Sequence, residues 1–276
     1  MLTMAVSLLF LSSGNAAGFD YLLTFDTPQF DPNFNAVTLA ADFTPPGVGY
    51  STTSHDGVLD LAKVAGAGNG DALLTSKFQI TGDFKLAVRG DRTDIGQGEA
   101  GLLVYLPHGF FDVFFSSQNQ IGSVIVDPPV PDQSASLNLA TTVVDFELRR
   151  TGSTLAAFAN GTQVLAASHP DYAAPVSFGI FSLQVHFFSG ATSARFDNFT
   201  IEADGVIPLL RIEKSGADVL LRWPAAARGF VLQYAADLGP GSPWTNLTAP
   251  TETLGQDSVA RVASSESFQF FRLALP

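Results

Sequence analysis

The chain has 276 residues, of which 46% are hydrophobic and 14% charged, a composition that excludes a disordered protein. Its net charge is −12 and the charges are scattered, which excludes nucleic acid and anionic membranes as partners. Cysteine is absent, so disulfides, thiolate metal sites and thiol nucleophiles are excluded as well.

The N-terminus resembles a secretory signal. An apolar run over residues 5–11 is followed by small residues that end in Asn15-Ala16-Ala17. This pattern predicts a signal peptide over residues 1–17. The usual basic segment is missing, so a buried N-terminal strand is the alternative. Later segments never reach 18 unbroken apolar residues, so we expect a secreted or cell-surface protein without an integral membrane segment after signal removal.

Apolar and polar residues alternate with a period of two along most of the chain, which predicts strands. Gly, Pro, Asn and Asp separate the strands, and no helical pattern longer than two turns lies between them. The first series of predicted strands covers residues 21–26, 58–64, 78–89, 101–106, 110–116, 143–149, 155–159, 163–167, 176–183 and 194–202. The sequence therefore predicts an all-β protein with an antiparallel sandwich or jelly roll over residues 18–204.

A second strand series follows a break at residues 204–208, which read Asp-Gly-Val-Ile-Pro. Its predicted strands cover residues 209–213, 219–223, 230–234, 259–263 and 268–273. Five short strands in some 70 residues predict a small C-terminal β-sandwich over residues 205–276.

The stretch VVDFELRRTGSTLAAFANGTQVL, residues 143–165, predicts three consecutive antiparallel strands. Asn160-Gly161 is the strongest short hairpin signal, since both central positions of a type I′ turn need positive φ. Thr151-Gly152-Ser153 marks the preceding turn. On the first strand, alternation places Val144, Phe146 and Leu148 on one face and Asp145, Glu147 and Arg149 on the other.

Three segments together resemble the concanavalin A-like lectin/glucanase superfamily, especially its laminin-G-like branch. They are FELRRTGSTLAAFANGTQV, FQITGDFKLAVRGDR followed by GEAGLLVYL, and PVSFGIFSLQ followed by ATSARFDNFTIE. The resemblance implies a concanavalin A-like jelly roll. It leaves function open, because the superfamily includes lectins, hydrolases and adhesion modules.

The resemblance also raises the question of a glycosidase. Laminarinase-like members carry E-x-D-x-E, in which two glutamates act as nucleophile and acid/base. Asp145 and Glu147 fit the last two positions, but Val143 stands at the nucleophile position and cannot attack a sugar. We therefore expect a charged strand face and not a catalytic site of this type. A related branch, the 3-keto-disaccharide hydrolase-like proteins, leaves an enzyme as the alternative.

In this superfamily a structural calcium ion often bridges the first and last strands. By resemblance, Asp197 is the expected ligand and Asp26 its neighbour. Calcium needs six to eight oxygen ligands, and two aspartates do not supply them alone. The alternative is that Asp197 and Asn198 cap the end of a strand.

A carbohydrate site usually offers an exposed aromatic ring with hydrogen-bonding groups beside it. Loop and strand-edge residues of these kinds make up the candidate ligand-binding set: the aromatic Tyr50, Tyr105, Phe110 and Tyr172, and the polar Asp91, Asp94, Glu99 and His108. The alternative for Phe110 is a place in the core with Phe111, Phe114 and Phe115, because alternation does not decide which face of that strand is exposed.

The C-terminal segment resembles a fibronectin type III/immunoglobulin-like module of secreted bacterial proteins. The resemblance rests on VLLRWP, on GFVLQYAADLGPGSPW and on the final FFRL. It implies that Trp223 and Trp244 occupy core positions, and that the module serves as a spacer, an attachment or a stabilising unit.

The sequence thus favours a secreted, non-catalytic protein whose sandwich binds a carbohydrate or another cell-surface ligand. The alternatives are a sugar hydrolase of the keto-disaccharide type and a purely structural surface module.

Overall fold

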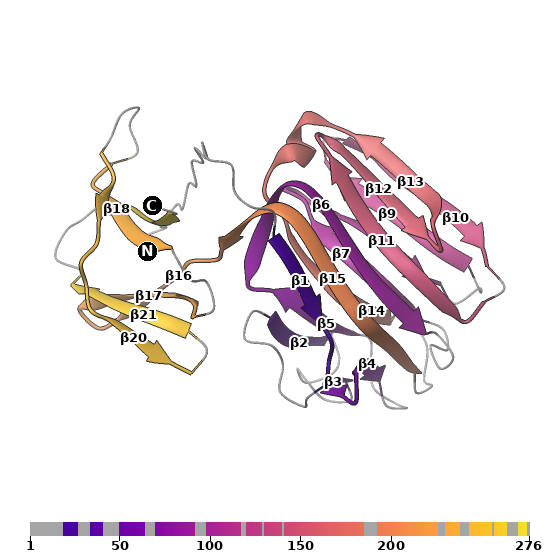
Figure 1. Cartoon of the computed structure of the whole chain (residues 1–276), viewed down its shortest axis with the longest axis horizontal. Coiled ribbons are helices and arrows are strands. Elements are labelled where there is room, and N and C mark those ends of the chain that lie inside the picture. The colour runs from indigo at the N-terminus through magenta and orange to yellow at the C-terminus, as the bar shows by residue number, and fades with distance from the viewer. Residues whose placement is uncertain are drawn as a thin grey trace. The chain divides into compact units, whose positions relative to one another are not determined.

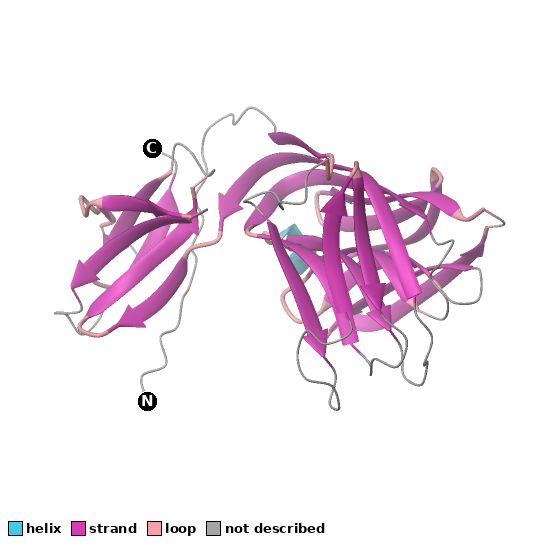
Figure 2. Ribbon diagram, turned by 90° about the horizontal axis from the view of Figure 1, so that it is seen from below, coloured by secondary structure: helices cyan, strands magenta, loops and turns pink. Residues whose placement is uncertain are grey.

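The computed structural model shows an almost purely β protein (Figure 2). It describes residues 19–26, 34–40, 50–63, 70–91, 98–116, 120–128, 130–139, 141–184, 192–225, 230–237, 243–255, 257–263 and 270–274. A single 3₁₀ turn, η1 (Pro170–Ala173), interrupts the strands among these residues. Within the same residues, no helix has the length and apolar character needed to cross a bilayer.

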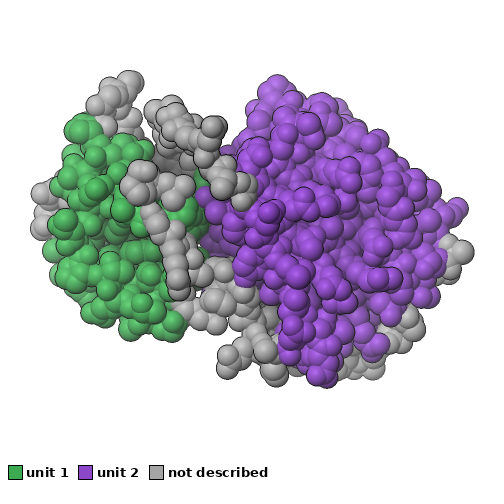
Figure 3. Space-filling model, viewed as in Figure 1, with its two compact units in different colours: residues 1–16, 207–276 green, residues 17–206 purple. Residues whose placement is uncertain are grey.

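The chain divides into two compact units (Figure 3). The first is residues 17–206, and the second comprises residues 207–276 together with residues 1–16, which lie outside the described part. Strand β15 (Thr192–Pro208) runs through this boundary without interruption.

The first unit is a sandwich of two antiparallel sheets, as the sequence predicts (Figure 1). In the eight-stranded sheet, β1 (Phe19–Leu23) pairs with β15, and the order of the other strands is β13 (Thr162–Ser168), β12 (Thr154–Ala159), β11 (Val143–Thr151), β6 (Phe78–Asp91), β15, β4 (Val58–Lys63) and β3 (Tyr50–His55).

The seven-stranded sheet forms the second layer. Its order is β10 (Val130–Asn138), β9 (Gln120–Asp127), β8 (Phe110–Phe115), β7 (Glu99–Tyr105), β14 (Ser177–Gln184), β5 (Gly70–Ser76) and β2 (Phe34–Ala40). The patterns did not predict β2, β3, β5, β9 or β10. Gly, Asn, Asp and Pro are frequent in residues 66–71 and 127–132, where β5 and β10 begin.

The predicted hairpins of residues 143–168 are confirmed. Asn160 and Gly161 have φ of 48° and 74°, as the type I′ turn requires. Val144, Phe146 and Leu148 are fully buried between the sheets. Across the sandwich, the ring of Phe146 meets that of Phe115 on β8 edge to face, with centroids 4.6 Å apart.

An arginine is also buried on this inner face. Arg150 shares the face of Leu148 and is 1% exposed. Its Nε donates to the carbonyl of Gly82 at 2.6 Å, and its Nη1 donates to the carbonyls of Tyr172 at 2.9 Å and Ala174 at 2.5 Å. The guanidinium lies 4.7 Å from the ring centre of Phe84. We call Arg150 and these four partners the Arg150 cluster.

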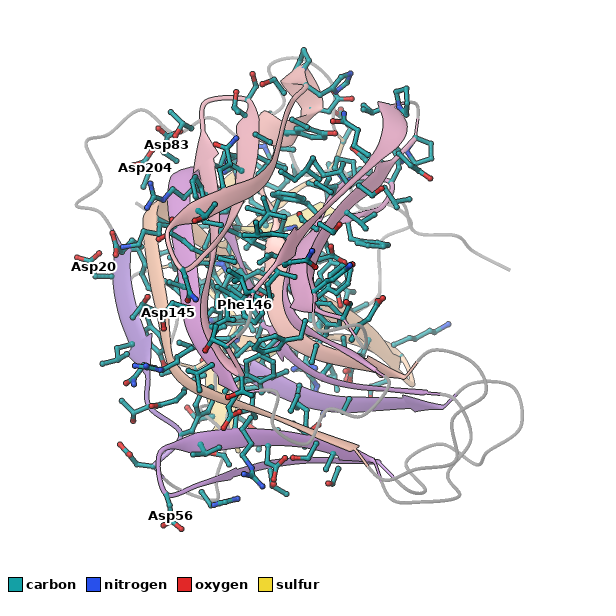
Figure 4. The ribbon with its side chains drawn as sticks, turned by 90° about the vertical axis from the view of Figure 1, so that its right-hand side faces the viewer. Asp20, Asp56, Asp83, Asp145, Phe146 and Asp204 are labelled. Atoms are coloured by element: carbon teal, nitrogen blue, oxygen red, sulfur yellow. The ribbon has the colours of Figure 1, made fainter. Side chains whose placement is uncertain are left out.

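Two aspartates connect the turns around the Arg150 cluster, and Figure 4 shows them close together. The backbone N–H of Asp83 donates to Asp204 Oδ2 at 2.8 Å, and Asp83 Oδ1 accepts from the N–H of Gly152 at 2.7 Å. Burial lowers the pKa of Arg150 to about 10, and the charges of Asp83 and Asp204 oppose that shift. The guanidinium therefore stays charged at neutral pH.

The second unit consists of two small antiparallel sheets. One has the order β16 (Arg211–Ser215), β17 (Asp218–Pro224), β21 (Asp257–Ala263), β20 (Thr251–Leu254); the other has the order β19 (Thr245–Asn246), β18 (Val231–Ala235), β22 (Phe270–Ala274). Trp223 lies in the core of this unit, as predicted. The prediction for Trp244 is wrong: its side chain is partly exposed and lies outside the core cluster.

Candidate functional site

The outer face of the eight-stranded sheet carries ion pairs. Asp145 points outward from β11, away from its buried neighbour Phe146 (Figure 4). Glu147 pairs with Arg149 on the same strand, and Asp145 lies 3.9 Å from Arg89 on β6. The predicted charged strand face is confirmed, and Val143 provides no nucleophile there.

The outer face of the seven-stranded sheet differs in chemistry. Four apolar side chains form a cluster on it, separate from the main core: Leu73, Leu103, Phe114 and Phe181. The rings of Phe114 and Phe181 lie 6.4 Å apart. The ring of Phe114 occupies the space that a Cβ on Gly122 would need, so glycine on β9 lets this ring lie against the sheet.

Two exposed aromatic rings extend this face at the end of the β7–β8 hairpin. Tyr105 pairs directly with Phe110 across the two strands, so both side chains lie on the same face. They are 40% and 37% exposed. Among the described side chains they are the only exposed aromatic ones. Phe110 therefore does not belong to the core, whereas Phe111 and Phe115 do.

We call residues 105–110, which comprise Tyr105, Phe110 and the turn between them, the hairpin tip. Hydrogen bonds from backbone N–H groups hold this turn in place. The N–H of Leu106 donates to the carbonyl of Gly109 at 3.0 Å. The N–H of His108 donates to Oδ1 of buried Asp127 on β9 at 2.9 Å. A Cβ on Gly109 would collide with the carbonyl of Val126, so only glycine fits there. The exposed rings thus stand on a fixed backbone.

A buried carboxyl group lies two residues from Phe110 on the same face. Asp112 is 7% exposed, and its Oδ1 accepts from the N–H of Val124 at 2.8 Å. Burial and, to a smaller extent, the negative charge of Glu99 on β7 raise the pKa of Asp112 to about 8, although the hydrogen bond from Val124 opposes this shift. Burial also raises the pKa of Glu99. The face therefore holds one carboxyl group that is largely protonated at neutral pH.

The structure brings together only part of the predicted ligand-binding set. Tyr105, His108 and Phe110 meet at the hairpin tip. Glu99 lies on the same strand as Tyr105, six residues away, or about 20 Å at the usual strand rise. Asp91 ends β6 in the other sheet and pairs with Val143.

Of the remaining three candidates, the structure describes one in full. Tyr172 is fully buried, with its carbonyl bonded to Arg150, so its predicted exposure is wrong. The side chain of Tyr50 and all of Asp94 lie outside the described residues.

The sequence analysis missed Asp112 and Asp127. A signal existed for Asp112, because it is the lone charge in the strand FFDVFF and shares the face of Phe110 and Phe114. An acid in that setting is expected to be buried and perturbed. Asp127 ends β9, directly before Pro128 and Pro129 in the sequence.

Of the two predicted calcium ligands, Asp26 follows the end of β1 and Asp197 lies inside β15, two residues before Phe199, which pairs with Leu23. Asp26 Oδ2 accepts from Thr24 Oγ1 at 2.5 Å, and Asp197 Oδ2 accepts from Asn198 Nδ2 at 2.7 Å. Among the described residues, no group of three acidic or histidine side chains could hold a metal ion. The described donors alone do not fit a calcium site. Asp197 lies inside β15, beside Asn198 with its φ of 53°, so the expected cap at a strand end is not found there.

The calcium prediction has a direct test. If Asp197 ligates calcium with other oxygen donors, excess chelator should lower the melting temperature by several degrees, because a bound ion stabilises only the folded chain. The Asp197→Ala variant should then melt low and be insensitive to chelator. Equal melting curves for the native protein with and without chelator would contradict the prediction of a bound calcium ion.

Comparison with known proteins identifies the fold. No family model matches the chain, and no curated protein matches it. Solved structures of the concanavalin A-like jelly-roll type do match, at 12% identity. LamAcat from Zobellia galactanivorans superposes with a TM-score of 0.53 over 66% of this chain and 96% of its own. The catalytic domain of an endo-1,3-β-glucanase (laminarinase) from Thermotoga petrophila gives 0.54 over 67% and 96%. An endo-acting O-glycanase of the human gut microbiota gives 0.52 at 11% identity, over 66% of this chain and 98% of its own.

Proposed function

We propose that the first unit binds carbohydrate at the hairpin tip, without cleaving it, and does so outside the cell. The observation that carries this proposal is the cross-strand pair of exposed rings, Tyr105 and Phe110, on one face of the sheet. Exposed aromatic rings side by side on a rigid hairpin are uncommon on a surface without a ligand.

The chemistry of the hairpin tip suits a sugar ring. The apolar C–H face of a pyranose packs against aromatic rings, and its hydroxyl groups need hydrogen-bonding partners at the edge. His108, which lies between Tyr105 and Phe110 in the sequence, is exposed. Ser177 on β14 pairs with Tyr105 across the sheet. The tip therefore combines an apolar surface with polar groups at its border.

The structural relatives suggest the first ligands to try. A variant of LamA from Zobellia galactanivorans was solved in complex with laminaritriose and laminaritetraose. Short β-1,3-glucans are therefore sensible first probes, followed by a broad array of glycans.

We expect Tyr105→Ala and Phe110→Ala each to weaken sugar binding by about tenfold, because each removes one stacking ring worth roughly 1.5 kcal/mol. Calorimetric titration of the full chain with the oligosaccharide selected from the array measures the effect. Leu22→Ala is the matched control, since Leu22 is 55% exposed but lies on β1 of the other sheet. Unchanged affinity in both ring variants would contradict the proposal.

A sugar hydrolase is the second candidate. It is favoured by the raised pKa of Asp112, because a glycosidase needs one carboxyl group that is protonated at neutral pH. Glu99, whose negative charge contributes to that shift, is the candidate for the second carboxyl group. Release of reducing sugar by the native protein, lost in both Asp112→Asn and Glu99→Gln, would establish hydrolysis and replace the non-catalytic proposal. If the protein binds no glycan on the array and releases no reducing sugar, the structural surface module remains as the interpretation.

A further inference from the structure

The second unit presents a polar surface on the outer face of its three-stranded sheet. On β18 and β22, Leu232, Tyr234, Phe271 and Leu273 pack in or against the core of the unit. The alternate residues Gln233 and Arg272 therefore lie on the opposite face of the sheet.

A row of hydrogen-bonded side chains crosses this face. Gln233 pairs in register with Asn246 on β19 and with Arg272 on β22. Its Nε2 donates to Asn246 Oδ1 at 2.9 Å, and its Oε1 accepts from Arg272 Nε at 2.8 Å. The guanidinium carbon of Arg272 also lies 4.2 Å from the ring centre of Trp244. Its orientation is thus fixed by one hydrogen bond and one stacking contact.

Arg272 differs from the other described arginines of the second unit in lacking an acidic partner. Arg211 pairs with Asp257 at 2.7 Å, Arg222 with Glu213 at 3.0 Å, and Arg261 with Asp218 at 3.1 Å. Within the described residues, no carboxylate lies within ion-pair distance of Arg272, although the guanidinium is held in place.

The distribution of charge permits an anion at this place. Residues 207–276 contain six basic and six acidic residues, so the whole net charge of −12 belongs to residues 1–206. An acidic ligand meets no net repulsion from the second unit itself, and charge farther away than about 8 Å is largely screened at physiological salt.

We propose that the surface formed by Trp244, Gln233, Asn246 and Arg272 binds the carboxylate of an acidic sugar, as in a uronic acid polysaccharide. The terminal N–H groups of a guanidinium match a carboxylate in bidentate geometry. The amides of Gln233 and Asn246 beside it offer hydrogen bonds to hydroxyl groups of the same sugar. The site is separate from the hairpin tip and takes a charged ligand, so it goes beyond the function proposed above.

Titration of the full chain with polygalacturonate tests this site. The native protein should bind, with affinity that falls as salt rises, and Arg272→Gln should lower the affinity at least tenfold. Arg261→Gln is the matched control: it removes the same charge from an exposed arginine of the other sheet and should bind as the native protein does. Arg272→Lys keeps the charge without the fork and should fall between native and Arg272→Gln.

Several outcomes would overturn the proposal. They are no binding of polygalacturonate by the native protein, equal affinity in Arg272→Gln, and equal affinity for polyglutamate, which has carboxylates but no sugar. Melting curves of the three arginine variants check that they are folded. The affinity of the native protein for a neutral β-1,3-glucan, measured alongside, reports on the hairpin tip, so failure of one site is distinguishable from failure of the other.

Discussion

Arg150→Ala is expected to lower the unfolding free energy of the first unit by about 3 to 5 kcal/mol. The change leaves the carbonyls of Gly82, Tyr172 and Ala174 without the donor that satisfies them in the buried Arg150 cluster. It also empties the space of a large side chain at the inner face of β11. Chemical unfolding followed by fluorescence or circular dichroism measures the loss.

The neighbouring arginine provides the control. Arg149 points to the other face of the same strand, where half of its side chain is exposed and it pairs with Glu147. Arg149→Ala should therefore cost less than about 1 kcal/mol. Similar losses in the two variants would show that the Arg150 cluster contributes nothing special to stability.

Asp112→Asn is expected to make the protein more stable at pH 8 and to have little effect near pH 4. The pKa of Asp112 is about 8 in the folded chain, far above its usual value of 3.8. The folded state therefore holds a proton that the unfolded state releases, so this residue's contribution to stability is full below pH 4 and is lost as the pH rises to 8. A shift of this size corresponds to as much as about 6 kcal/mol.

Asparagine suits this test because its side-chain oxygen can still accept from the N–H of Val124 while carrying no charge. Urea unfolding of both proteins at pH 4, 6 and 8 gives the difference in unfolding free energy at each pH. We expect that difference to grow steadily in favour of Asp112→Asn. A difference that stays constant across this range would show that Asp112 is ionised in the folded protein.

Alternation and turn chemistry predict the sandwich well where one face of a strand is polar. In residues 143–168 the charged residues mark the outer face, and Asn160-Gly161 fixes the register of the hairpin. The same rule extended by one residue would have placed Arg150 on the buried face of Leu148. Two adjacent arginines gave no other sign that one of them is in the core.

The rest of the site depends on contacts that a strand pattern does not contain. Both faces of β8 carry apolar side chains, and Asp112 is the one exception. Alternation therefore could not tell which phenylalanine ring of this strand is exposed. Tyr172 follows Pro170 in a 3₁₀ turn, where no periodicity indicates whether a side chain faces the core. Trp244 lies outside the core cluster and stacks with Arg272, a contact between residues far apart along the chain.

Because the backbone of the hairpin tip is fixed, some residue positions on this face tolerate substitution and others do not. Tyr105, His108 and Phe110 project from the sheet, so their replacement changes the surface without disturbing the strands beneath. Gly109 and Gly122 admit no larger side chain, because a carbonyl and a ring already fill the space. Relatives with other ligands would therefore differ at the three projecting positions and keep the two glycines, and a library built for new specificity should be randomised in the same way.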